Sequence, residues 1–137
     1  MDDNKKRDLV DEWFLQADYD YDTAMSLFSS SRYIYAIFIC HLSLEKALKA
    51  IYIERLAKLP PKTHNLIYLI DTMQLEVRNE DDESFNLIND VSVLIRYPQD
   101  LKALLGHYGK EETEEVLNGA KKVIEWIKTQ SEVLSSK

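Results

Sequence analysis

Apolar residues recur at intervals of three and four along most of the chain, which is the period of an amphipathic helix. Over residues 8–28 this pattern predicts a first helix that ends at three consecutive serines. A second helix is predicted over residues 32–59, and two consecutive prolines end it. The second helix has almost no polar face before Glu45, so we expect it to lie at the centre of a bundle.

Three further helices are predicted downstream. A short helix over residues 64–74 has Thr63 as its expected cap, and longer helices are predicted over residues 83–95 and 111–134. The residues between them are an acidic linker, 76–83, and the least regular segment, 96–110. The pattern therefore predicts an all-α fold, an antiparallel up-and-down bundle of four long helices plus one short helix. The expected domain comprises residues 8–134, with tails at residues 1–7 and 135–137.

Composition narrows the range of functions. The single cysteine excludes an internal disulfide and any zinc site that needs two thiolates from one chain. None of the three histidines has a glutamate three residues before it, so we expect no di-metal carboxylate site, no metal and no cofactor. With no apolar stretch of membrane-spanning length and no signal-like start, we expect a cytoplasmic protein that does not enter a membrane.

Charge is unevenly distributed along the chain. The net charge of −7 opposes indiscriminate binding to nucleic acid. However, residues 46–64 contain five basic side chains and a single acidic one. We therefore expect any polyanion to bind at this segment, and we expect charge reversal at Lys58 and Lys62 to weaken the binding.

Two groups of polar residues are candidates for chemistry. His41, Glu45 and Lys49 are spaced by four residues and form one polar strip on the predicted central helix. The strip is either part of a ligand-binding site or a helix-surface ion pair with a histidine that fixes packing. Arg96 and Tyr97 end the fourth predicted helix, where the guanidinium either binds phosphate or caps the helix.

Two more histidines could act with these groups. His107 lies in the irregular segment after Arg96, and His64 opens the short third helix. A histidine near a phosphate-binding arginine could serve as acid or base in cleaving a phosphodiester.

Together these stretches resemble the HEPN domain family, the higher-eukaryote and prokaryote nucleotide-binding domain. The resemblance covers residues 8–134 and rests on three stretches: Ala17 to Phe28 after Trp13; the run from His41 to Ala50; and Lys62-Thr63-His64-Asn65-Leu66 followed by Arg96-Tyr97-Pro98. It implies a helical bundle that dimerises, with a cleft at or near the dimer interface. Many members of the superfamily are metal-independent RNA endonucleases, often toxins encoded beside a minimal nucleotidyltransferase that acts as antitoxin.

The nuclease signature of that superfamily is an arginine followed after four to six residues by a histidine. Here ten residues separate Arg96 from His107, and neither of the other arginine–histidine pairs has the nuclease spacing. This departure from the spacing of the nuclease signature argues against RNA cleavage.

Three functional hypotheses follow. The favoured one is a dimeric, non-catalytic module that binds a nucleotide, RNA or a nucleotidyltransferase partner, with these candidate ligand-binding residues: His41, Glu45, Lys49, His64, Arg96 and Tyr97. The second is a metal-independent ribonuclease toxin in which Arg96 orients the phosphate and His107 transfers protons. The third is a dimeric scaffold for an adjacent enzyme. A homodimer is also expected because the central helix is apolar over more of its circumference than one bundle usually covers.

Overall fold

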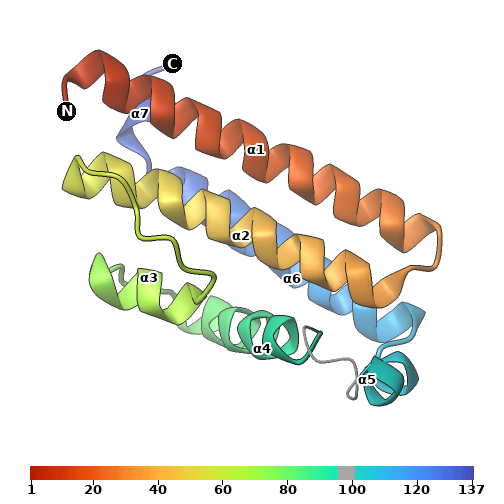
Figure 1. The fold of residues 1–137 in the computed structure, drawn as a ribbon. Helices are drawn as coiled ribbons and strands as arrows, with labels where there is room; N and C mark the ends of the chain where they lie inside the picture. Colours follow the sequence, from red (N-terminus) through yellow and green to blue (C-terminus); the bar gives the residue numbers. More distant parts are fainter. Residues whose placement is uncertain (96–100) are drawn as a thin grey trace.

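The structure, a computed structural model, describes residues 1–95 and 101–137 and shows a helical bundle without a strand in those residues. The helices are α1 (Asp3–Ser29), α2 (Tyr33–Leu56), α3 (Leu66–Thr72), α4 (Asn79–Ile95), α5 (Leu101–His107), α6 (Lys110–Thr129) and α7 (Glu132–Ser135). Four long helices, α1, α2, α4 and α6, alternate in direction, and both termini lie at the same end (Figure 1). The predicted all-α, antiparallel up-and-down bundle is confirmed.

Helix α2 occupies the centre of this bundle. It packs against α1, α3, α4, α5 and α6 (Figure 1), and most of its residues are buried. Ile37, Leu44, Leu48 and Ile51 are fully buried within the one chain. The apolar circumference of α2 therefore gives no argument for a second subunit, and dimerisation stays a prediction on other grounds.

Two of the long helices, α1 and α4, begin several residues earlier than predicted. Helix α1 begins at Asp3, where the Asp2 side chain accepts a hydrogen bond of 2.8 Å from the Lys5 backbone N–H, so most of the expected N-terminal tail is helical. Helix α4 begins at Asn79, and part of the expected acidic linker forms its first turn. Carboxylates are favourable at this position because the N-terminal end of a helix dipole is positive. Here a run of acidic residues indicates a helix start and not a linker.

The connection between α2 and α3 is longer than predicted. Helix α2 ends at Leu56, and the following Ala57 adopts a left-handed conformation with a φ of 51°. The predicted cap of α3 was wrong by two residues: Asn65, not Thr63, accepts the capping hydrogen bond of α3, from the Tyr68 N–H.

The C-terminal segment differs in two ways. Residues 101–107 form helix α5 in the segment expected to be irregular, and the single predicted last helix is divided into α6 and α7. Glu54 of α2 accepts hydrogen bonds from the Ser131 hydroxyl at 2.7 Å and from two backbone N–H groups of α7 at 2.8 and 3.1 Å. These bonds satisfy the exposed donors at the start of α7. Across the described residues, no helix combines the length and apolarity that crossing a membrane requires.

Candidate functional site

Three of the predicted site residues meet at a partly buried ion cluster. Glu45 Oε1 lies 2.7 Å from His64 Nδ1, and Glu45 Oε2 lies 2.9 Å from Lys49 Nζ. The ammonium of Lys49 also lies 5.7 Å from the centre of the Trp13 ring, within the range of a cation–π contact. We call these four residues the Glu45 centre.

Helical spacing and a loop together build the Glu45 centre. Glu45 and Lys49 are one turn apart on α2, Trp13 comes from α1, and His64 comes from the connection just before α3. The glutamate and lysine side chains are 6% and 8% exposed, whereas that of His64 is 58% exposed. Burying two charges is costly, and the paired geometry, the histidine and the indole face offset that cost.

The contact with Glu45 fixes the orientation of the His64 ring. A carboxylate accepts hydrogen bonds, so Nδ1 carries the hydrogen that faces it. The second ring nitrogen, Nε2, is thereby left on the imidazole edge that does not face Glu45. This nitrogen accepts a hydrogen bond in the neutral ring and donates one in the protonated ring.

The remaining predicted site residues do not join this centre. His41, one turn before Glu45 on α2, is completely buried and does not line an open surface. Arg96 and Tyr97 lie outside the described residues. His107 lies at the end of α5, which packs against the start of α2. Because a helix rises 1.5 Å per residue, the ten residues from Tyr35 to Glu45 place roughly 15 Å of α2 between the two regions.

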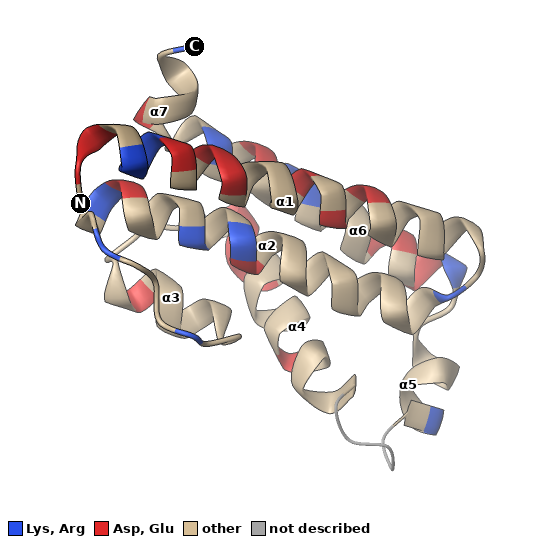
Figure 2. Cartoon of the chain, turned by 45° about the horizontal axis from the view of Figure 1, so that its top comes forward, with Lys and Arg blue, Asp and Glu red and all other residues tan. Residues whose placement is uncertain are grey.

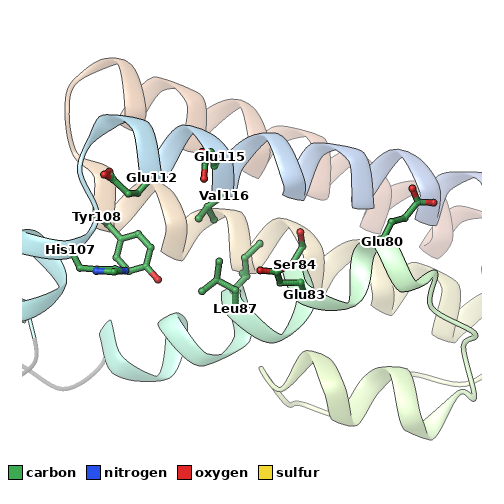
Figure 3. A pocket seen from close by; sticks show the side chains of 10 residues that line it. Glu80, Glu83, Ser84, Leu87, His107, Tyr108, Glu112, Glu115 and Val116 are labelled. Carbon is green, nitrogen blue, oxygen red and sulfur yellow. The ribbon is translucent and has the colours of Figure 1, made fainter.

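His107 lines a separate cavity of about 340 Å³ between α4, α5 and α6, which we call the His107 cavity (Figure 3). Its ring meets that of Tyr108 edge-to-face, with the centres 4.7 Å apart. Burial raises the pKa of the Tyr108 hydroxyl above its ordinary value. The walls carry four glutamates: Glu80, Glu83, Glu112 and Glu115. Sequence spacing did not predict this group, because its members come from two helices that are distant along the chain.

Acidic side chains neutralise two of the lysines in the basic segment 46–64. Lys46 pairs with Asp20 of α1 at 2.7 Å, and Lys49 pairs with Glu45. Arg55, Lys58 and Lys62 are exposed, and within the described part of the chain none of them forms an ion pair with a carboxylate. Figure 2 shows basic residues in blue at the end of α2 and along the connection to α3. We call Arg55, Lys58 and Lys62 the α2-end cations.

Two other kinds of chemistry, nucleophilic attack by a cysteine and metal binding, find no support in the described residues. Burial raises the pKa of the Cys40 thiol to about 12, so it is not a thiolate nucleophile at neutral pH. No group of three or more histidine, cysteine, aspartate or glutamate side chains is arranged to hold a metal ion in the ranges described.

The comparisons with known proteins agree with this architecture. The profile of the HEPN domain matches residues 10–130. The structure is similar to that of TT1696 from Thermus thermophilus, with a TM-score of 0.73, 21% sequence identity, and coverage of 89% of this chain and 98% of that one. It is also similar to ST0689, described as an archaeal HEPN homologue, with a TM-score of 0.69, 20% identity, and coverage of 88% and 96%.

No curated protein matches the chain. The two structural similarities show the fold, and the profile match extends over most of the sequence. This chain belongs to the HEPN domain family.

Proposed function

We propose that this HEPN protein binds the phosphate groups of RNA or of a nucleotide and does not cleave them. The observation that carries the proposal is the exposure of the α2-end cations without a carboxylate partner among the described residues, in a chain whose net charge is −7. Lys58 and Lys62 lie on the same connection as His64, so a phosphate there would meet an ammonium group and an imidazole. Arg96 and Tyr97 remain proposed contacts on the sequence argument alone.

The surroundings of His107 support binding without cleavage. A nuclease must bring a polyanion to its acid–base histidine, but four glutamates line the cavity that His107 faces. Their field repels phosphate, and no lysine or arginine is among the described residues that line this cavity. His107, which would transfer protons in the alternative, an RNA endonuclease toxin using Arg96 and His107, therefore lies in acidic surroundings that disfavour a phosphate.

The binding surface is tested by charge reversal with a matched control. Lys58→Glu with Lys62→Glu should weaken binding of a labelled single-stranded RNA by about tenfold or more and flatten its salt dependence, because phosphate contacts release counterions. Lys121→Glu with Lys122→Glu changes net charge equally on exposed positions of α6. Fluorescence anisotropy at several salt concentrations measures both. Equal loss in the two double variants would show a net-charge effect and would reject the site.

Absence of cleavage is tested separately. We expect the purified protein to leave labelled RNA intact in EDTA. Cleavage that Arg96→Ala and His107→Ala both abolish would establish the nuclease alternative and contradict the proposal.

We also propose a homodimer, with a minimal nucleotidyltransferase as an alternative partner. Exposed apolar side chains lie where α5 contacts its neighbours: Tyr35 of α2 and Leu105 of α5 line one hollow, and Leu94 of α4 lines another beside α5. An apolar patch that water covers in the monomer is typical of an interaction surface. Sedimentation should show a dimer that Leu105→Asp converts to monomer; a wild-type monomer at micromolar concentration would reject this part of the proposal.

A further inference from the structure

We infer that phosphate binding at this surface is coupled to the uptake of one proton by His64. The inference rests on the proposed function and adds the means by which pH controls it. Neutral His64 presents a lone pair at Nε2, which repels a phosphate oxygen, whereas protonated His64 presents an N–H and a positive charge.

The Glu45 centre dictates where the proton goes. Glu45 Oε1 accepts from Nδ1 at 2.7 Å, so Nδ1 holds a hydrogen in both charge states of the ring. Nε2 is therefore the nitrogen at which a second ring hydrogen can be added.

The charges around the ring make this contact with phosphate feasible. Lys49 neutralises Glu45 from the other carboxylate oxygen at 2.9 Å, so the ligand does not face an uncompensated carboxylate. Helix α1 contributes the uncharged Trp13, and α3 has no charged side chain before Asp71. Helix α4 contributes the uncharged Asn89, which bonds the backbone of Leu66 and the side chain of Asn65.

Lys62 is the nearest basic residue along the chain to His64 and is exposed with it. An ammonium and an imidazolium separated by one residue can both contact a single phosphate group. Each repels the other when no anion is present, and the phosphate removes that repulsion. Binding and protonation should therefore strengthen each other, as linkage requires.

A conservative variant separates this role from a structural one. In His64→Asn the side-chain amide can still donate to Glu45, but it carries no equivalent of Nε2. His107→Asn removes the other exposed histidine and serves as the matched control. The probes are a labelled single-stranded RNA and a nucleoside triphosphate, so that RNA and free nucleotide are distinguished as sources of the phosphate.

From about pH 8 to about pH 5, where histidine gains its second ring proton, wild-type affinity should rise about three- to tenfold. H107N should follow the wild type, and H64N should show a flat profile with the RNA, whose phosphodiesters keep their charge over this range. The terminal phosphate of the nucleotide gains a proton in this range, so for that probe the difference between H64N and the wild type is the measure. A response with RNA alone assigns the site to RNA, and a response with both probes assigns it to phosphate in general. An H64N profile as steep as the wild type would overturn the inference.

Calorimetry in buffers of different ionisation enthalpy gives a second measurement on the unmodified protein. Net proton uptake is expected when the RNA binds, and zero uptake overturns the inference even if H64N does not fold. Binding that K58E/K62E weakens, but that takes up no proton, rejects only the role of His64. Absence of binding in the wild type rejects the proposed function and the inference together.

Discussion

Two exposed histidines lie in opposite electrostatic surroundings in this bundle. His64 is tied to a buried carboxylate that Lys49 neutralises, and exposed basic residues precede it on the same connection. His107 contacts Tyr108 in a cavity with four glutamates. His107, the candidate for the acid–base residue of a nuclease, is thus less suited than His64 to bind a phosphate.

The Glu45 centre and the His107 cavity also differ in how exposed their carboxylates are, and therefore in how much they contribute to stability. The carboxylate of the Glu45 centre is 6% exposed, while the glutamates of the His107 cavity are all exposed. A buried ion whose partner is removed keeps its desolvation cost, but an exposed ion is hydrated by water. The same substitution should therefore have very different consequences in the two places.

The largest expected effect is the loss of stability in Glu45→Ala. Lys49 would stay buried without its carboxylate, which typically costs about 3–5 kcal/mol in the free energy of unfolding. Glu115→Ala, the matched change in the His107 cavity, should stay within about 0.5 kcal/mol of the wild type. Urea unfolding followed by circular dichroism measures both.

A double variant sharpens this comparison. Glu45→Leu with Lys49→Met replaces the ion pair by apolar side chains and should recover most of the stability that Glu45→Ala loses, because no buried charge remains. Equal stabilities of the Glu45→Ala and Glu115→Ala proteins would show that the two regions are energetically alike and that Lys49 is hydrated.

The Glu45 centre was partly accessible from the sequence. The spacing of four residues places Glu45 and Lys49 on one face of a helix, but the burial of this pair follows only from the packing of the bundle. Periodicity likewise gave the four long helices and the central position of α2. His64 was a candidate, but its contact with Glu45 depends on the path of the connection between α2 and α3, which no local pattern determines.

Other features depend on contacts between residues far apart in the chain. Asp20 neutralises Lys46 from a neighbouring helix, and Glu45 neutralises Lys49, so three basic residues of the segment 46–64 remain without an ion pair among the described residues. Glu54 holds the start of α7 and so divides a segment that reads as one continuous helix. The glutamates around His107 come together only when α4 packs beside α6. Helical periodicity contains no information on such pairs.

Alkaline pH should lower the free energy of unfolding by an intermediate amount, through Cys40 and through a contact between α1 and α6. The Tyr21 hydroxyl donates to the Leu117 carbonyl of α6 at 3.0 Å, and burial is the main cause that raises its pKa from 10.0 to about 12. Burial likewise raises the pKa of Cys40 from 9.0 to about 12. The unfolded chain therefore loses these protons at a lower pH than the folded chain does.

A raised pKa in the folded state gives stability that is complete below the unfolded pKa and is lost as pH rises through the folded value. Stability should accordingly fall from pH 9 upward, by about 1–3 kcal/mol at about pH 11. Tyr21→Phe should flatten the part of this decrease above pH 10. Urea unfolding at a series of pH values measures it, and a wild-type curve that is level up to pH 12 would contradict the assignment.

The smallest expected effect comes from neutralising the acidic wall of the His107 cavity. Glu112→Gln with Glu115→Gln removes two of the four carboxylates and should raise RNA affinity by no more than about twofold at low salt, since exposed charges act weakly and are screened. The gain should disappear near physiological ionic strength, where the Debye length is about 8 Å. Fluorescence anisotropy with the same labelled single-stranded RNA as in the test of the α2-end cations measures this affinity. A much larger gain in RNA affinity, or RNA cleavage that depends on His107, would show that the glutamates suppress a phosphate site in this cavity. Both histidines would then belong to phosphate sites, and the glutamates would regulate the site at His107.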